Sequence, residues 1–195
     1  LNTKWNYTFS DKNRLYFSGY FGNDVLKFRQ PNRDFKFDLP YGNKTGTLRW
    51  NHLFHERMFM NVSLIYNDYK FQFSGGQDDF VFKLFSGVRD WNFKIDFENY
   101  PNTNHTIKYG VNYIYHKLTP NTASATTGDT QFNTTFLPKY ANEAAVYILD
   151  DMKLGQKWAL NTGLRISAFQ QVGPYTSKLD GQEFGDFEPV KTYTG

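Results

Sequence analysis

Residues 90–99 read Asp-Trp-Asn-Phe-Lys-Ile-Asp-Phe-Glu-Asn, with every second residue apolar. Trp91, Phe93, Ile95 and Phe97 share one parity, and the charged and amide residues share the other. Successive side chains of a β-strand point to opposite faces of a sheet. The pattern therefore predicts a strand with one face suited to hydrocarbon and the other suited to water.

The same alternation recurs along the chain. From Trp158 to Phe169 it holds for about a dozen residues, which is longer than the roughly five or six residues of an average globular strand. We predict strands at residues 3–10, 14–28, 44–54, 58–73, 80–100, 106–118, 140–152 and 158–172, with a ninth starting near Val190.

The connections between these strands alternate in length. Short polar connections are predicted at residues 11–13, 55–57, 101–105 and 154–157, and longer ones at 29–43, 74–79, 119–139 and 173–189. Transmembrane β-barrels have short periplasmic turns and longer extracellular loops, and their strands need about 9 to 11 residues to cross the membrane. The rhythm predicts an all-β, antiparallel, up-and-down transmembrane β-barrel segment of about 8–9 strands.

Composition restricts the class further. Aromatic residues make up 19% of the 195 residues, and barrels concentrate such residues at the two membrane interfaces. The mean hydropathy of −0.64 is too low for a helical membrane protein. The absence of cysteine excludes disulfides and thiolate metal sites, and a net charge of +3 with interspersed signs disfavours nucleic-acid binding.

The ends of the chain suggest that it is part of something larger. No signal peptide is readable at Leu1, so we expect either that one was removed or that the chain is an interior fragment. Residues 192–195 read as the start of another strand. An open sheet would leave unpaired backbone groups in lipid, at a cost of several kcal/mol each, so further strands are expected.

Several phrases of the sequence resemble a known family. They are residues 9–18 (FSDKNRLYFS), 48–52 (LRWNH), 88–94 (VRDWNFK), 100–106 (YPNTNHT), 109–116 (YGVNYIYH), 138–143 (PKYANE) and 160–165 (LNTGLR). They look like TonB-dependent outer-membrane receptors, most of all the branch that carries a carboxypeptidase-like regulatory domain ahead of the plug. The resemblance covers essentially the whole chain.

This resemblance implies a 22-strand barrel in the outer membrane of a Gram-negative bacterium. In that family an N-terminal plug fills the barrel, and its TonB box couples uptake to the proton-motive force. The sequence contains no plug, no TonB box and no terminal strand ending in an aromatic residue. The implied identity is therefore a middle segment of the barrel, with outer-membrane lipid, the plug, the TonB system and a nutrient (siderophore, metal complex, glycan or peptide) as partners.

Two groups of candidate site residues follow. Polar residues that would face the lumen are candidates for contact with plug or substrate: Asp90, Lys94, Asp96, Lys108, Asn112, Asn161 and Arg165. Aromatic residues in the two longest predicted loops are candidates for contact with a ligand: Phe35, Phe37, Tyr41, Phe132 and Phe136. The alternative is that the first group only bonds to neighbouring strands and the second only packs the loops together.

No catalytic or metal site is expected. His52 and His55 flank a strand end, where their spacing of three does not have the meaning that it has on a helix. Asp150 and Asp151 are adjacent and so point to opposite faces, which prevents their acting as a carboxylate pair. The acidic residues of the last loop lack the spacing of a calcium loop: Asp180, Glu183, Asp186 and Glu188. We expect neither a cofactor nor enzymatic activity.

Three functions fit these observations. The first is the barrel portion of an energy-coupled receptor that imports a scarce nutrient. The second is a passive porin or structural outer-membrane barrel, which would lack the plug. The third is a soluble all-β module such as a carbohydrate-binding sandwich, which requires the aromatic parity to be buried between two sheets.

Overall fold

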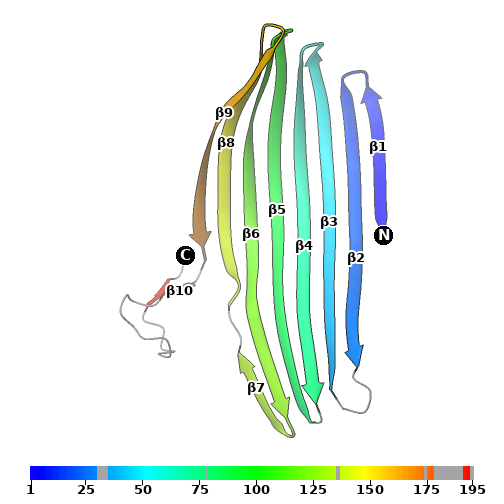
Figure 1. Cartoon of the computed structure of the whole chain (residues 1–195), viewed down its shortest axis with the longest axis vertical. Helices are drawn as coiled ribbons and strands as arrows, with labels where there is room; N and C mark the ends of the chain where they lie inside the picture. Colours follow the sequence, from blue (N-terminus) through cyan, green and yellow to red (C-terminus); the bar gives the residue numbers. More distant parts are fainter. Residues whose placement is uncertain (30–34, 78, 135–136, 174, 178–190, 194–195) are drawn as a thin grey trace.

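The computed structural model describes residues 1–29, 35–77, 79–134, 137–173, 175–177 and 191–193 (Figure 1). Its strands are β1 (Asn2–Ser10), β2 (Asn13–Arg29), β3 (Lys36–His55), β4 (Met58–Gln77), β5 (Phe80–Asn102), β6 (His105–Thr127), β7 (Thr130–Thr134), β8 (Lys139–Leu154), β9 (Trp158–Val172), β10 (Tyr175–Ser177) and β11 (Lys191–Tyr193). Within these ranges there is no helix that is both long enough and apolar enough to cross a membrane.

One large antiparallel sheet contains most of these strands, as predicted. Strands β1 to β6, β8 and β9 pair in sequence order, and β7 adds to the end of β6. The sheet is open, with β1 and β9 as its edges (Figure 1). The predicted ninth strand is present as β11, but it pairs with β10 in a separate two-stranded sheet and does not extend the large one.

The four connections that were predicted to be short all lie at one end of the sheet, at the top of Figure 1. We call this the short-turn end and the opposite one the long-hairpin end. The predicted bounds of β9 are confirmed at Trp158–Val172, and those of β1 differ by one residue. In the turn before β9, Gly155 has a φ of 74°, a conformation that glycine adopts without steric cost.

Three of the four predicted long connections are mostly strand, which corrects the sequence reading, and most of the fourth, 173–189, lies outside the described residues. Strands β3 and β6 run through Pro40 and Pro120, which we had taken as loop residues. Proline lacks the N–H that a sheet ladder needs. The β3–β4 ladder omits Pro40, and a bulge in the β5–β6 ladder leaves out Pro120, so both strands continue past their prolines. Gly75 and Gly76 likewise lie inside β4, not at the tip of its hairpin.

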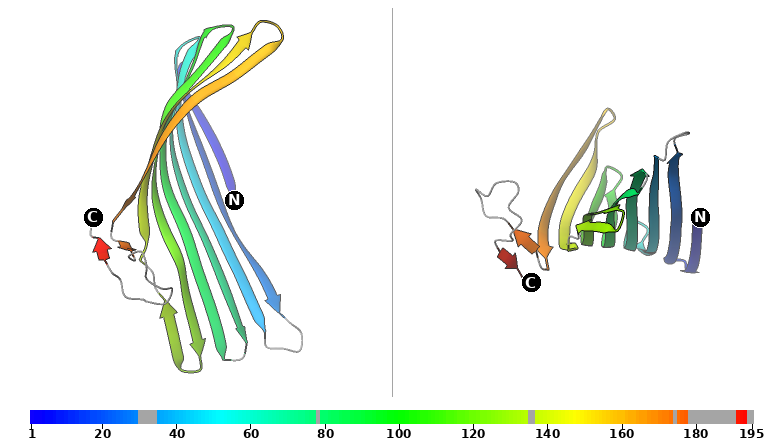
Figure 2. Two further views of the ribbon diagram at one scale, coloured as in Figure 1. Left: turned by 60° about the vertical axis from the view of Figure 1, so that its left-hand side comes forward. Right: turned by 90° about the horizontal axis from the view of Figure 1, so that it is seen from below.

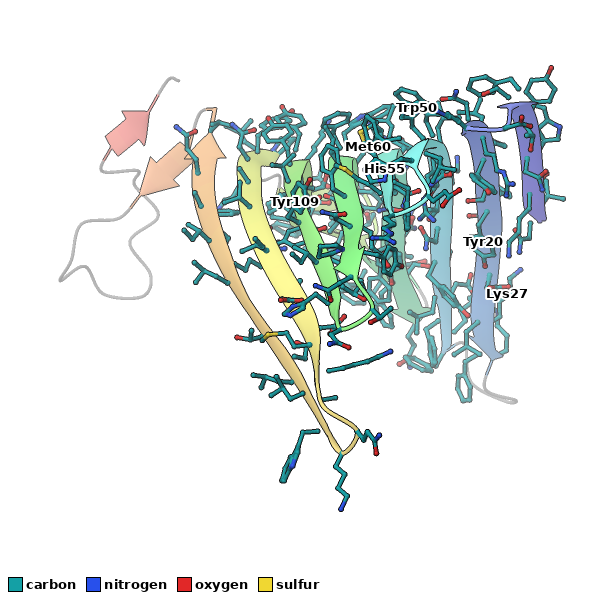
Figure 3. All side chains as sticks on the ribbon, turned by 90° about the horizontal axis from the view of Figure 1, so that it is seen from above. Tyr20, Lys27, Trp50, His55, Met60 and Tyr109 are labelled. Atoms are coloured by element: carbon teal, nitrogen blue, oxygen red, sulfur yellow. The ribbon has the colours of Figure 1, made fainter. Side chains whose placement is uncertain are left out.

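The sheet forms a single layer without a core in the described residues. The buried apolar side chains are Ala141 and Ala145 alone, and side chains leave both faces of the ribbon (Figure 3). The accessible surface is 14298 Å², whereas a compact globular protein of 22.9 kDa would expose about 9600 Å². A sheet with this much exposed apolar surface needs another phase or further protein to cover it.

Successive hairpins are staggered in one direction, which Figure 2 shows as a slant of the strands across the sheet. Leu15, Trp50, Val111 and Ile166 lie on one row of register partners. Counted from the middle of the nearest short turn (Asp11, Glu56, Thr103 and Gln156), they stand four, six, eight and ten residues away. The register thus shifts by one residue per strand.

Candidate functional site

The register assigns every strand residue to one of two faces. The belt face contains Trp91, Phe93, Ile95, Phe97 and their register partners, and the network face contains the residues between them. On β8 the belt-face residues Val146 and Ile148 are exposed, whereas Ala141 and Ala145 on the network face are buried. Side chains crowd on the concave side of a bent sheet, so this difference indicates that the sheet curves around the network face.

The belt face carries apolar residues across all eight consecutive strands of the sheet. One complete row of register partners consists of Tyr7, Leu15, Trp50, Val62, Ile95, Val111, Val146 and Ile166. The next row towards the long-hairpin end consists of Trp5, Phe17, Leu48, Leu64, Phe93, Tyr113, Ala144 and Ala168. All four tryptophans of the chain lie on this face. We call this apolar region the belt.

The belt ends at nearly the same height on the two central hairpins, β3–β4 and β5–β6, when height is counted from the short turns. Towards the long-hairpin end, the first charged belt-face residues are Lys44 and Asp68, twelve residues from Glu56, and Arg89 and Lys117, fourteen from Thr103. Rings lie just below this border, where Tyr66 and Trp91 have centroids 4.8 Å apart.

The other border lies near the short turns. Here His105 Nδ1 is 2.7 Å from Asp150 Oδ2, and His52 Nδ1 is 2.7 Å from Asn13 Oδ1. Phe97 and Tyr109 stack beside this border with centroids 5.0 Å apart. Aromatic pairs therefore flank the belt on both sides.

The network face holds a chain of polar contacts at the level of the belt. Asp96 on β5 accepts a hydrogen bond from the hydroxyl of Tyr147 on β8 and lies 2.9 Å from Lys94 Nζ. Tyr147 reaches Asp96 across β6 because the residue between them is Gly110, where a Cβ would meet the tyrosine ring. The guanidinium of Arg165, on β9, lies over the other side of the same ring, 5.9 Å from its centroid.

Two further groups continue this network. Lys108 Nζ is 3.4 Å from Asp151 Oδ2, and Asn161 donates a hydrogen bond to the same carboxylate. Nearer the long-hairpin end, His116 Nδ1 is 2.8 Å from Asp90 Oδ1 and its Nε2 is 3.6 Å from Glu143 Oε2. These contacts join β5, β6, β8 and β9 through side chains in addition to their backbone ladders.

All seven predicted polar residues lie on the network face. Six of them take part in the contacts above, and sequence reasoning missed their shared partners Tyr147 and His116. Asn112 is different, since its buried Oδ1 has no hydrogen-bond partner among the described residues. The structure therefore brings Lys94, Asp96 and Arg165 together around Tyr147 and leaves Asn112 outside this network.

Beyond the charged border the apolar residues change faces. On β4 the belt-face residues Met60, Val62, Leu64 and Tyr66 give way to Tyr69, Phe71 and Phe73 on the network face. Strands β3 and β5 show the same reversal. The result is a ladder of phenylalanine rings on the network face, which we call the aromatic ladder: Phe28, Phe35, Phe37, Phe73 and Phe82, with neighbouring centroids 5.2 to 6.4 Å apart.

The predicted loop aromatics are relocated by this finding. Phe37 and Tyr41 belong to β3 and Phe132 belongs to β7, so the prediction that they lie in loops was wrong; their strands continue where we expected connections. All three lie on the network face. Phe35 directly precedes β3 and contacts Phe28 and Phe37, while Phe136 lies outside the described residues.

Sequence reasoning missed Phe28, Phe73 and Phe82 as members of the ladder. The signal was present, because the apolar parity of β5 changes from even at Phe82 to odd at Trp91.

In the described residues no group of three or more His, Cys, Asp or Glu side chains could hold a metal ion. Asp180, Glu183, Asp186 and Glu188 lie outside those residues. Asp150 and Asp151 occupy opposite faces, as expected.

No protein-family model, no curated protein and no solved structure matches this chain.

Proposed function

We propose that this chain is a segment of the wall of a large outer-membrane β-barrel, of the TonB-dependent receptor type, that imports a scarce nutrient. The belt would face the hydrocarbon of the membrane, the network face would line the lumen, and the long-hairpin end would stand outside the cell. The proposal draws on the family resemblance of the sequence together with the physical features below.

The observation that carries the proposal is the level apolar belt on one face of the sheet. On the two central hairpins it extends from about four to twelve residues from the short turns, which corresponds to a height of about 22 Å for strands tilted by about 35°, and on β8 it begins beyond Asp150. Transmembrane barrels carry an apolar band about 25 Å tall with aromatic residues at both borders. A soluble sheet has no reason to end its apolar surface at one height on successive hairpins.

The stagger of the hairpins supports the same interpretation. A shift of one residue per strand, with about 3.3 Å per residue and about 4.8 Å between strands, tilts the strands by about 35° from the barrel axis. Transmembrane barrels have tilts of about 35 to 45°. The described strands supply eight consecutive members of such a wall, and the receptor type would require further strands to close it.

The network face suits a filled lumen. Several of its charged residues are paired with one another, Lys94 with Asp96, Lys108 with Asp151 and His116 with Asp90, so these pairs would not need water to neutralise them. Above the membrane, the aromatic ladder would line the entrance, where flat rings offer a nutrient large apolar contact areas at little entropic cost.

The alternatives are supported less well. A carbohydrate-binding sandwich would bury the belt against a second sheet, but the described residues form a single layer with the belt exposed. A passive porin shares the belt and the stagger. It would not need the aromatic ladder, which is the specific feature that favours a receptor.

The test uses the full-length protein in its own cells. Growth is measured on single limiting sources of iron chelate, glycan or peptide, for the wild type, for a gene deletion and for a strain without TonB. A receptor requires that one source fail in both deletions. Growth that depends on the protein but not on TonB would indicate a porin, and a protein found outside the membrane fraction would exclude both.

The aromatic ladder is tested in the same assay. Phe82→Ala is expected to weaken growth on the limiting source, whereas Phe85→Ala, three residues along β5 on the belt face, should leave growth unchanged. Equal effects of both variants would show that the ladder has no special role in uptake.

A further inference from the structure

The belt face carries an excess of positive charge beyond the belt. In the described strands, its long-hairpin half contains eight cationic residues (Lys27, Arg29, Lys36, Lys44, Lys70, Lys83, Arg89 and Lys117) and two acidic ones (Asp38 and Asp68). Arg29 Nη1 is 2.7 Å from Asp38 Oδ1, and this contact lowers the pKa of Asp38. Because eight cations share two carboxylates, this half of the face keeps an excess of positive charge.

Four of these cations form a level group at the border of the belt. Lys44, Lys70, Arg89 and Lys117 all stand twelve or fourteen residues from their short turns. Asp68 is the acid among them, with Arg89 Nη2 at 3.0 Å and Lys70 Nζ at 3.9 Å from its Oδ2. One carboxylate can balance one of the four charges, so the group keeps an excess of about three positive charges.

These cations remain accessible to a ligand. The Asp68 side chain is 9% exposed, whereas those of Lys70 and Arg89 are 52% and 41% exposed. Lys44 Nζ lies 5.3 Å from the ring centroid of Phe21, and Lys117 Nζ lies 5.8 Å from that of Tyr140. The rings hold the lysine stems against the sheet while the ammonium groups stay at the surface.

A hollow of about 380 Å³ opens in the same place. Its lining includes Lys44, Lys70 and Asp68 at the border, and Pro40, Phe85 and a second acid, Asp24, further out. The lining thus combines ammonium groups with apolar surface, directly above the belt. A ligand that fits it has anionic groups at the level of the cations and hydrocarbon at the level of the belt.

We propose that this border group binds the phosphate groups of a phosphorylated glycolipid of the outer leaflet, whose acyl chains lie along the belt. The inference rests on the proposed function, because it needs the belt to stand in the membrane. Each lysine or arginine near an anionic membrane surface strengthens association about fivefold. An excess of about three positive charges at this level therefore corresponds to roughly a hundredfold preference for a phosphorylated lipid.

The experiment is native mass spectrometry of the full-length protein in detergent, titrated with diphosphoryl lipid A, with the same lipid after removal of its phosphates, and with sodium pyrophosphate. The wild type should bind diphosphoryl lipid A roughly a hundredfold more tightly than the dephosphorylated lipid. Pyrophosphate alone should bind weakly. Pyrophosphate binding as tight as that of the lipid would overturn the assignment to a lipid ligand.

The variant Lys44→Gln, Lys70→Gln, Lys117→Gln removes the border charge and should lose this preference. Its control, Lys27→Gln, Lys36→Gln, Lys83→Gln, makes the same change of charge on the same face but further from the belt, and should bind within about twofold of wild type. Equal binding by both variants would refute the border site.

Insertion into the membrane is measured in parallel, from the heat-modifiable gel mobility of each variant. A wild type that inserts but does not prefer the phosphorylated lipid refutes this inference and leaves the barrel proposal intact. A wild type that does not insert refutes both.

Discussion

Leu164→Arg places a charge in the middle of the proposed hydrocarbon layer. Leu164 lies on the belt face of β9 and is 64% exposed. It stands eight residues from Gln156, and a distance of eight residues is the middle of a belt that extends from about four to twelve residues from the short turns. An arginine at the midplane of a membrane costs a transmembrane barrel about 2 to 4 kcal/mol. The same substitution in water would cost less than about 0.5 kcal/mol.

Depth along β9 makes this prediction quantitative. Each step of two residues raises the position by about 5 Å in strands tilted by about 35°. Ile166→Arg should therefore cost less than Leu164→Arg, and Gln170→Arg, fourteen residues from Gln156, should cost about 0 to 1 kcal/mol. Asn161→Arg is the control, because it lies on the network face beside Asp151 and its charge would be neutralised there.

The assay is urea unfolding of the full-length protein in phosphatidylcholine vesicles, followed by heat-modifiable gel mobility. The difference in midpoint multiplied by the slope gives the change in the free energy of unfolding. A cost that falls from Leu164 to Gln170 is the predicted result. Equal costs along the series, or an Asn161→Arg variant as unstable as Leu164→Arg, would refute the assignment of the belt to lipid.

Other substitutions test the sheet itself, by the same unfolding measurement. Gly110→Ala should destabilise the protein by about 1 to 3 kcal/mol, because the new Cβ would collide with the carbonyl oxygen of Ile95. Gly46→Ala, with open space around its Cβ, should be neutral or stabilising. Similar effects at both glycines would be inconsistent with the described packing. Gly155→Ala should cost about 1 kcal/mol because its φ of 74° suits glycine, and an unchanged midpoint would count against this turn conformation. Asp96→Ala should cost about 1 to 2 kcal/mol, because it removes the acceptor of the Tyr147 hydroxyl and the ionic partner of Lys94. Insertion into the membrane should not be impaired, and failure to insert would mean that the residue faces lipid.

The fold class and the two faces were predictable because they depend on local alternation. Residues 90–99 and β9 keep one parity throughout, and a strict period of two specifies which side chains share a face once the strand exists. The seven polar candidates could be assigned to one face for the same reason. The short turns were also readable, since each is a brief polar interruption between two alternating segments.

The long-hairpin half was predicted only in part: the predicted strands at 14–28 and 80–100 match β2 and β5, but those of β3 and β6 stop short because the sequence there mixes strand residues with turn residues. Pro40 and Pro120 suggested loops, but the structure leaves each of them out of one ladder and continues the strand. The reversal of apolar parity between Tyr66 and Tyr69 was visible in the sequence. The predicted strand at residues 58–73 runs through this reversal without a change of face, whereas the reversal marks the level at which the two faces exchange their surroundings.

Contacts between strands that are not neighbours in the sheet were beyond sequence reasoning. Tyr147 on β8 reaches Asp96 on β5 across β6, and this contact depends on the registers of two separate strand pairs. Gly110 leaves room for the tyrosine, yet a glycine in a strand has several possible meanings. Only the assembled sheet brings these three residues together.

The most direct test of the account is a nitroxide scan along β4 of the full-length protein in lipid vesicles. This chain has no cysteine, so single cysteines at residues 58–77 can be labelled individually. We predict that molecular oxygen, which concentrates in hydrocarbon, reaches the labels at Met60, Val62 and Leu64. At even positions from Asp68 onwards, a water-soluble nickel complex should reach the labels instead of oxygen. Oxygen access at odd positions, or the same access along all of β4, would contradict the assignment of the belt to the membrane.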